Sequence, residues 1–317
     1  MPAAITTNQL TKQFGDVRAL DGVSLEVPQG SIYGFLGANG AGKTTALKIL
    51  AGLTRPTSGS ATVAGVPLAA GESYKRAIGF LGQEPRFYAW MTARQTLRYV
   101  AGFYPWVSDP VEPRIAEALE LTGIAAAADR PTRTYSGGMR QRLGIAQALI
   151  GRPQVLLLDE PASALDPVGR RDVLDLMNAL RDQATIFYST HILDDVQRVS
   201  DHVAILDQGR LVRAAPTAEL LATFSRDRVR VVVRGATDST AGGLAALAGV
   251  ASVELAARDR DQVTFLIQAR SGETDPVQRA VTRFAVESDL TLVSNAPEQV
   301  DLEEVFLRLI DSQERAA

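Results

Sequence analysis

The hydrophobic pattern of roughly the first 215 residues predicts short buried strands that alternate with helices. Strands are expected at Val23–Val27, Ser31–Leu36, Ser60–Ala64, Val155–Leu158, Ile186–Tyr188 and Val203–Leu206. The pattern also predicts a helix over Lys43–Ala51 that ends at Gly52, and mostly helical structure from about Thr92 to Leu149. Short apolar strands between helices are typical of a parallel sheet covered on both faces. We therefore expect an α/β fold here.

The pattern starts again after a boundary near residues 215–227, where a short helix, Thr217–Phe224, precedes a charged stretch. The first element expected beyond it is a strand at Val229–Val233, followed by an Ala-rich helix. Two strands, at Val250–Leu255 and Val263–Ile267, come next, and then a helix at Pro276–Glu287 and a strand at Leu290–Val293. This βαββαβ order is the split βαβ arrangement of ferredoxin-like domains. We expect one domain over residues 4–220 and a small α+β domain over 225–317.

Composition agrees with a folded protein of two domains and excludes several classes of site. The chain has 317 residues, 46% hydrophobic and 22% charged, which is typical of globular proteins and argues against extensive disorder. A net charge of −3 gives no sign of a nucleic-acid partner. The absence of Cys excludes disulfides, thiolate metal sites and Cys nucleophiles, and only His191 and His202 are present, too few for a poly-His metal site.

Neither a membrane span nor a signal peptide is expected. The longest weakly polar stretch in the second half, Ala241–Val253, is shorter than the roughly 20 strongly apolar residues that a span requires. The first ten residues have neither a basic start nor an apolar core. We therefore expect a cytoplasmic protein, whose membrane role, if it has one, depends on a partner.

A glycine-rich segment lies directly between a predicted strand and a predicted helix. The run Gly37-Ala38-Asn39-Gly40-Ala41-Gly42-Lys43-Thr44 matches G-x-x-x-x-G-K-[ST], the phosphate-binding P-loop or Walker A motif. Its glycines let backbone N–H groups curl around phosphates, and the helix N-terminus adds partial positive charge. Lys43 would then reach the β- and γ-phosphates, and the Thr44 hydroxyl would hold Mg²⁺.

A second motif is a buried strand that ends in two acids, Val155-Leu156-Leu157-Leu158-Asp159-Glu160. Strands of a parallel sheet present their carboxyl ends to the ligand crevice, so both acids are expected near the P-loop. Asp159 fits a Walker B carboxylate that holds Mg²⁺. Glu160 fits a carboxylate that polarises the attacking water, which an ATPase needs and a passive nucleotide binder does not.

Tyr135-Ser136-Gly137-Gly138-Met139, placed shortly before the Walker B strand, distinguishes this chain from other P-loop proteins. Here the sequence resembles the ATP-binding cassette (ABC) family, whose signature is commonly LSGGQ. The central Ser-Gly-Gly is intact, while Tyr and Met stand at the outer positions. Ser136 would cap the N-terminus of a following helix, Arg140–Ile150, and that end could clamp a γ-phosphate.

Further motifs of the family match in the same order along the chain. Gln83 matches the Q-loop glutamine, which senses Mg²⁺ and the γ-phosphate, and His191 matches the switch histidine. Ser163-Ala164-Leu165-Asp166 matches the D-loop that crosses the dimer interface. Phe14 stands where the family usually has an aromatic residue that stacks on adenine, and the neighbouring Val17 is a weaker candidate for the same contact.

The resemblance, which covers roughly residues 4–215, implies an ABC cassette with a parallel core sheet, an antiparallel β subdomain and a helical subdomain. It implies an ATPase that uses ATP and Mg²⁺. The implied catalytic residues are Glu160, His191 and Gln83, and the implied metal-site residues are Thr44, Gln83 and Asp159. The implied nucleotide-binding residues are Phe14, Gly37, Asn39, Gly40, Ala41, Gly42, Lys43, Thr44, Thr45, Ser136, Gly137, Gly138 and Asp166.

The C-terminal run Leu302-Glu303-Glu304-Val305-Phe306-Leu307-Arg308-Leu309 is similar to the ending of ATPase subunits in bacterial drug- and antibiotic-export ABC systems. Its apolar residues also follow the i, i+3, i+4, i+7 spacing of an amphipathic helix, which would dock on the small domain or on a second subunit. Both interpretations can hold together. The tail favours an exporter over an importer.

The leading hypothesis is an exporter ATPase that works as a head-to-tail homodimer and drives a separate membrane permease from the cytoplasmic face. The segment Phe87–Arg98 would form the docking groove for the permease, although Phe87, Tyr88 and Trp90 could equally belong to a helical core. The alternatives are a soluble ABC ATPase that acts on ribosomes or DNA, a nucleotide-dependent regulator that does not hydrolyse ATP, and an importer ATPase with a C-terminal sensor domain. The transported substrate would be selected by the permease.

Overall fold

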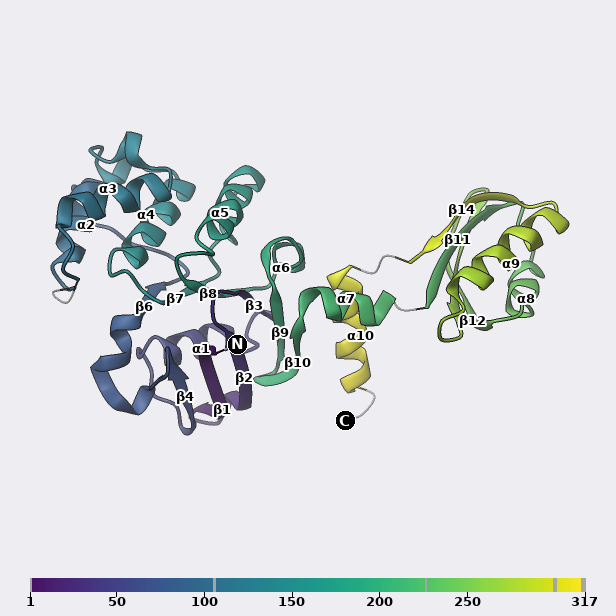
Figure 1. The fold of residues 1–317 in the computed structure, drawn as a ribbon, viewed down its shortest axis with the longest axis horizontal. Helices are drawn as coiled ribbons and strands as arrows, with labels where there is room; N and C mark the ends of the chain where they lie inside the picture. The colour runs from purple at the N-terminus through teal and green to yellow at the C-terminus, as the bar shows by residue number, and fades with distance from the viewer. Residues whose placement is uncertain (1, 105–106, 226, 299–300, 315–317) are drawn as a thin grey trace. The chain divides into compact units, whose positions relative to one another are not determined.

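The computed structural model describes residues 2–104, 107–225, 227–298 and 301–314, which form two compact units (Figure 1). The first unit contains the chain up to Thr217 together with the segment from Phe306 onward. The second unit is Ala218–Val305. Each unit has its own hydrophobic core.

A six-stranded sheet in the order β10-β9-β3-β8-β7-β6 forms the centre of the first unit. Its strands are β3 (Ile32–Leu36), β6 (Ile78–Leu81), β7 (Val155–Asp159), β8 (Thr185–Thr190), β9 (His202–Asp207) and β10 (Arg210–Pro216). All neighbours run parallel except β10, which pairs antiparallel with β9. Every residue of β3, β7 and β8 is buried, as continuous apolar runs in a doubly covered parallel sheet should be. The predicted α/β fold is confirmed.

An antiparallel sheet in the order β2-β1-β4-β5 packs on the same core. Its strands are β1 (Ala3–Phe14), β2 (Val17–Pro28), β4 (Ser58–Val63) and β5 (Val66–Pro67). The hydrophobic pattern did not predict β1, because the polar run Thr6–Gln9 interrupts its apolar alternation. Pairing with both β2 and β4 makes it a strand in spite of that run.

The helices of the first unit fall into two groups (Figure 1). The helical subdomain contains α2 (Ala93–Ala101), α3 (Val111–Leu121) and α4 (Gly137–Leu149), which share a core that includes Leu97, Ile115 and Leu143. The remaining helices are α1 (Lys43–Leu50), α5 (Pro167–Ala179), α6 (Leu193–Val199) and the part of α10 (Leu302–Glu314) from Phe306 onward. Short 3₁₀ segments occur at Leu68–Ala77, Ala125–Ala127 and Thr132–Thr134. The predicted stop of the first helix at Gly52 fits its φ of 72°, the left-handed conformation that glycine adopts readily.

The second unit contains a four-stranded antiparallel sheet in the order β12-β13-β11-β14. Its elements are α7 (Thr217–Ser225, which begins at the boundary), β11 (Arg228–Arg234), α8 (Thr240–Ala245), β12 (Val250–Asp259), β13 (Gln262–Ala269), α9 (Thr274–Glu287), β14 (Thr291–Pro297) and the start of α10 (Leu302–Glu314). The βαββαβ order and this strand arrangement agree with the predicted ferredoxin-like topology. Its core joins β11 and β13 to α8 and α9 through residues such as Val231, Phe265 and Val281.

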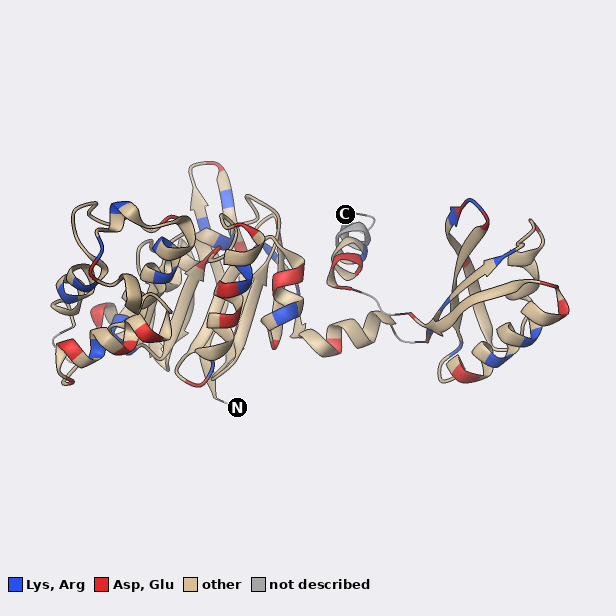
Figure 2. Cartoon of the chain, turned by 90° about the horizontal axis from the view of Figure 1, so that it is seen from above, with Lys and Arg blue, Asp and Glu red and all other residues tan. Residues whose placement is uncertain are grey.

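No helix among the described residues is both long enough and apolar enough to cross a membrane. Figure 2 shows both acidic and basic residues on helices of each unit. In α10, the residues at the start of the predicted apolar face, Leu302 and Val305, are completely buried. Phe306 and Leu309, farther along that face, are partly buried.

Candidate functional site

The P-loop connects the buried strand β3 to helix α1. Gly42, the residue before the helix, has a φ of 108°, and a Cβ there would lie 2.3 Å from the carbonyl oxygen of Ala19. Only glycine fits this position without strain. No side chain caps the N-terminus of α1, so its first backbone N–H groups remain free for an anion.

Lys43 is the buried cation of this loop, with only 4% of its surface exposed. Its Nζ donates hydrogen bonds to the carbonyl oxygens of Gly37, at 2.7 Å, and Ala38, at 3.0 Å. Glu160 Oε1 lies 3.8 Å from the same nitrogen. Burial lowers the pKa of Lys43, and the charges of Glu160 and Asp159 oppose that change. The ammonium of Lys43 therefore has two carbonyl partners within the chain, and its nearest carboxylate, that of Glu160, lies beyond hydrogen-bond distance.

Asp159, at the end of β7, joins the P-loop to the neighbouring strand β8. Its Oδ1 accepts hydrogen bonds from Thr44 Oγ1 at 3.0 Å and from Ser189 Oγ at 2.6 Å. Ser189 Oγ in turn accepts a hydrogen bond from the backbone N–H of Glu160 at 2.9 Å. Because β7 and β8 are parallel and pair Asp159 with Ser189, their carboxyl ends bring these groups together.

The Glu160 carboxylate lies close to the side chains of both Gln83 and His191. Gln83 Nε2 donates a hydrogen bond to its Oε2 at 3.3 Å, and His191 Nδ1 lies 3.3 Å from its Oε1. The residue is 8% exposed and has a φ of 48°, a left-handed conformation that is unfavourable for a residue with a long side chain. Backbone strain of this kind is concentrated at functional sites.

A cavity of about 540 Å³ opens over these groups. Nine of the residues predicted from the sequence line it: Asn39, Gly40, Gly42, Lys43, Thr44, Thr45, Gln83, Glu160 and His191. Ala19, Ser163 and Ala164 complete the lining. Of the other P-loop positions, Gly37 and Ala41 are buried beneath the loop. Cationic, carboxylate and imidazole groups therefore converge on one space large enough for a small ligand.

The donor groups beside Asp159 are of the kind that Mg²⁺ binds. The Thr44 hydroxyl, the Asp159 carboxylate and the Gln83 amide are hard oxygen donors, which this ion prefers. No cluster of three or more His, Asp or Glu side chains suited to a metal occurs in the described parts of the chain. Mg²⁺ does not need such a cluster, because it is usually held by one or two protein groups, water and substrate phosphates.

Ser136 and its neighbours do not line this cavity. Ser136 caps α4, and its Oγ accepts a hydrogen bond from the backbone N–H of Met139 at 3.2 Å. Asp166, in the D-loop, likewise caps α5 by accepting from the N–H of Gly169. Neither Gly137 nor Gly138 reaches the P-loop cavity. The predicted signature is therefore a helix N-terminus that is separate from the P-loop within one chain.

Phe14 lies at the tip of the β1–β2 hairpin with half of its surface exposed. The Lys12 ammonium lies 4.7 Å from the centre of its ring, a cation–π contact. Val17 is 66% exposed on the same hairpin. Neither lines the cavity, whereas Ala19, farther along β2, does. The Phe14 ring is thus accessible for stacking, but the structure does not place it in the cavity.

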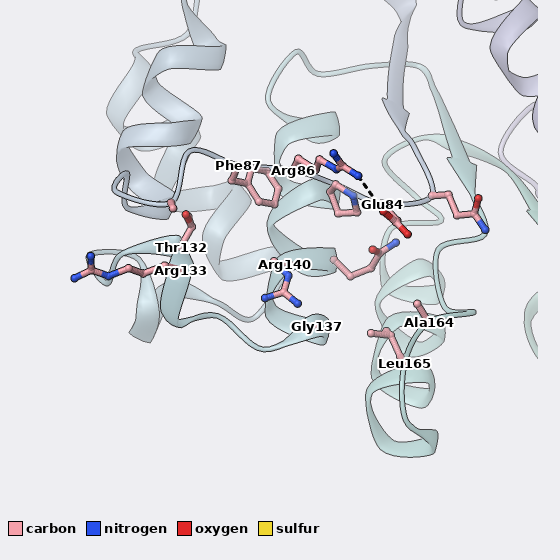
Figure 3. A pocket seen from close by; sticks show the side chains of 13 residues that line it. Glu84, Arg86, Phe87, Thr132, Arg133, Gly137, Arg140, Ala164 and Leu165 are labelled. Carbon is pink, nitrogen blue, oxygen red and sulfur yellow. Dashed lines mark ion pairs between the residues drawn. The ribbon is translucent and has the colours of Figure 1, made fainter.

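A second cavity, of about 560 Å³, lies between the Q-loop segment, the start of α4 and the D-loop (Figure 3). Gln83 lines both cavities. Three arginines, Arg86, Arg133 and Arg140, line the second one together with Phe87. Gln141, 6% exposed, also lines it, and its Nε2 has no hydrogen-bond partner among the described residues.

The aromatic residues of the predicted docking segment differ in how far their side chains are buried. Phe87 is partly buried and packs on the core of the helical subdomain. Tyr88 and Trp90 are 53% and 71% exposed, and their ring centres lie 4.8 Å apart. The outer signature residue Tyr135 is buried in the same core, where its hydroxyl donates to the carbonyl oxygen of Ala127 at 2.7 Å.

Two residues of the site were missed by sequence reasoning. Ser189 was absent from the predicted set, although a serine at the carboxyl end of the strand next to Asp159 is a detectable signal once β7 and β8 are paired. Ala19 has no side-chain chemistry, and its contact with Gly42 comes only from the fold. No motif could have indicated Ala19.

A P-loop with a buried lysine, two acids at the end of a parallel strand and a separate helix N-terminus with Ser-Gly-Gly define an ATP-binding cassette. The ABC transporter family model matches residues 20–163. Together with the relatives described next, this match shows that the chain belongs to the ATP-binding proteins of ABC transporters, and that it binds and hydrolyses ATP.

Two relatives and one solved structure illustrate the similarity. The daunorubicin/doxorubicin resistance ATP-binding protein DrrA of Streptomyces peucetius is 34% identical over 310 residues, which cover 96% of this chain and 92% of that protein. The bacitracin transport ATP-binding protein BcrA of Bacillus licheniformis is 39% identical over 219 residues, 68% of this chain and 71% of that protein. The dimeric structure of a bacterial ABC transporter cassette, MJ0796, aligns with a TM-score of 0.61 at 25% identity over 67% of this chain and 98% of that one.

Proposed function

We propose that this protein is the ATPase subunit of an exporter and that its ATP-bound form is a homodimer that drives a separate membrane permease. The observation that carries the proposal is the separation of the Ser136 helix end from the cavity around Lys43. Export is supported by relatives whose names give drug resistance and bacitracin transport as their roles. The nearly full-length similarity to the daunorubicin resistance protein includes the C-terminal domain.

The residues of the P-loop cavity divide the proposed chemistry among them. The backbone N–H groups of α1 and Lys43 bind the β- and γ-phosphates. Thr44, Asp159 and Gln83 would hold Mg²⁺, which would neutralise phosphate charge. Glu160 accepts a proton from the attacking water, and His191 contacts the γ-phosphate and orients Glu160.

A second copy of the chain completes each site. Two-fold symmetry places the same surfaces of both copies against each other, so the signature of one protomer can face the P-loop of its partner twice. Ser136, Gly137 and Gly138 then supply a helix N-terminus for the γ-phosphate. The exposed D-loop, with Asp166, lies beside the signature, because a Cβ on Gly137 would be 3.7 Å from Leu165.

The cavity in Figure 3 is the proposed docking site for the permease. Its apolar lining from Phe87 and Leu165 fits a short helix of a membrane protein, and Tyr88 and Trp90 extend the contact surface. Gln83 lines both cavities and so links the permease contact to Glu160. Docking there would hold the protein at the cytoplasmic face of the membrane.

The dimer can be tested with protein in which hydrolysis is blocked. We expect Glu160→Gln protein to run as a dimer with Mg-ATP, and mainly as a monomer or looser dimer with ADP or without nucleotide. Adding Ser136→Arg should abolish the ATP-dependent association, because a bulky cation replaces a small capping hydroxyl at the seam. Size-exclusion chromatography with light scattering measures both, with exposed Ser73→Arg as a control. Migration of Glu160→Gln protein that does not depend on ATP would contradict the proposal.

Mixing two inactive variants tests whether the contact is made between protomers. A Lys43→Ala protomer paired with a Ser136→Arg protomer leaves one composite site intact and the other doubly broken. We expect the mixture to regain part of the ATPase activity that each variant lacks alone. No recovery in a confirmed heterodimer would argue against independent composite sites.

We also propose that residues 4–220 form the nucleotide-binding domain and that 225–317 regulate it or stabilise the dimer. No phosphate-binding motif occurs in the second segment. A chain ending at Phe224 should bind ATP with similar affinity but lose part of its dimer stability or coupling. A chain ending at Glu298 lacks α10 but keeps the sheet of the second unit. Comparing the two truncated chains separates the role of α10 from that of the sheet. Nucleotide binding lost with either truncation would refute the boundary or the role.

A further inference from the structure

A buried arginine in the helical subdomain has no ion-pair partner among the residues that the structure describes. Arg114, on α3, is only 3% exposed. Its Nε and Nη1 are buried and have no hydrogen-bond partner among the described residues. A guanidinium carries a positive charge and five N–H donors. A buried charge without a partner is strongly destabilising, so this position favours the arrival of an anion.

Arg114 lines a cavity of about 340 Å³ that is distinct from the two described above. Ala118 and Leu121 follow it at i+4 and i+7 on the same face of α3. Leu149, from the last turn of α4, adds a further apolar wall, and Gln183 adds a polar side chain. Glu117, Arg152 and Pro153 complete the lining, so the cavity has the Arg114 cation, the Glu117–Arg152 ion pair, one amide and four apolar residues.

Glu117, the carboxylate in the lining, is engaged by Arg152, which lines the same cavity. Arg152 Nη2 pairs with Glu117 Oε2 at 2.8 Å, and its Nε pairs with Asp109. Arg152 has a φ of 49°, and its N–H donates to the carbonyl oxygen of Leu149 at 2.9 Å. With both acids bound to Arg152, the charge of Arg114 remains for a ligand.

We propose that this cavity binds a small organic anion, a monocarboxylate with a short apolar tail. Its carboxylate pairs with the guanidinium of Arg114 and its tail packs on Leu121 and Leu149. Arginine binds carboxylates with good geometry, and one unpaired cation matches one negative charge. The volume is near the lower end of the range of about 300–1,000 Å³ typical of ligand pockets, which fits a short tail.

The cavity touches the far ends of two elements that carry the proposed ATP chemistry. Leu149 ends α4, whose other end is capped by Ser136. Pro153, also in the lining, lies shortly before β7, whose other end is Asp159. A ligand here therefore contacts the helical subdomain and the segment that leads into β7, and none of the described residues that line the nucleotide cavity lines this one.

The test is thermal unfolding of the full chain with butyrate, at an ionic strength held constant with sodium chloride. We expect saturating butyrate to raise the Tm of the wild-type protein by about 3 °C. Isothermal titration calorimetry should show one butyrate per chain. Arg114→Met should unfold at a higher temperature than wild type without butyrate, because it removes an uncompensated charge, and should not respond to butyrate.

Two further variants and a second anion complete the experiment. Arg198→Met, on α6, removes an exposed arginine and should keep the full butyrate response. Arg152→Met frees Glu117, one turn from Arg114, and should weaken butyrate binding by about tenfold or more. Formate, which lacks a tail, should give a smaller shift than butyrate.

Three outcomes would overturn the proposal. One is a butyrate response of Arg114→Met equal to that of wild type. Another is a lower Tm of Arg114→Met without added anion, which would mean that the arginine already stabilises the free protein. The third is an equal shift with formate and butyrate, which would leave the apolar tail without a role.

Discussion

Replacing Lys43 with alanine should abolish tight ATP binding and ATP turnover. Lys43 is the buried cation beside the first N–H groups of α1, and within the described parts of the chain no other Lys or Arg lines that cavity. Truncating a buried charged partner costs about 3 kcal/mol or more, so the affinity for ATP should fall by about 100-fold or more. Equilibrium titration with a fluorescent ATP analogue and a phosphate-release assay measure the two effects.

Lys48→Ala is the matched control, because Lys48 lies on the same helix with an exposed side chain. It should retain wild-type affinity and turnover. Mg-ATP should raise the Tm of wild type and Lys48→Ala but not of Lys43→Ala, since only bound ligand stabilises the fold. Comparable ATPase rates in wild type and Lys43→Ala would refute the assignment of the P-loop.

Glu160→Gln should keep ATP binding while slowing hydrolysis by about 100-fold or more, the range expected for a lost general base. The amide has the same shape as the carboxylate but cannot accept the proton. Because Glu160 Oε1 also lies 3.8 Å from Lys43 Nζ, its neutralisation leaves the lysine freer for phosphate. We therefore expect ATP affinity equal to or higher than that of wild type.

Single-turnover kinetics separate this chemical step from binding and product release. Glu26→Gln, an exposed change on β2, should leave the rate unaltered. An unchanged single-turnover rate in Glu160→Gln would move the catalytic role to another residue. A parallel loss of affinity would instead mean that Glu160 acts chiefly in holding the P-loop.

The sequence was sufficient to predict those parts of the fold in which the local residue pattern favours the same structure as the packing of the folded chain. Continuous apolar runs such as Val155–Leu158 are buried strands, and the Gly52 stop and the Ser136 cap occur where predicted. The strand β1 was missed because its polar run is typical of a loop and only pairing on both sides makes it a strand.

The site could be predicted where chemistry resides in motif side chains, and less where it depends on the fold. Lys43, Thr44, Gln83, Glu160 and His191 do line one cavity, although they come from separate segments. Nothing in the chain order indicated Ser189, whose hydroxyl connects Asp159 to Glu160. The unpartnered state of Arg114 also depends on which acids pair with Arg152, and a pattern of residues cannot give that.

The contacts that Lys43 makes within the chain have a consequence for ligand discrimination. Its ammonium is already held by two carbonyl oxygens and faces Glu160, so an entering ligand must replace those contacts. A neutral nucleoside brings no charge to do so, whereas a triphosphate brings several. When the products leave, the Lys43 ammonium can again donate hydrogen bonds to the carbonyl oxygens of Gly37 and Ala38. These hydrogen bonds compete with the binding of weakly charged ligands. We therefore expect the P-loop to bind polyphosphates and to discriminate against uncharged metabolites.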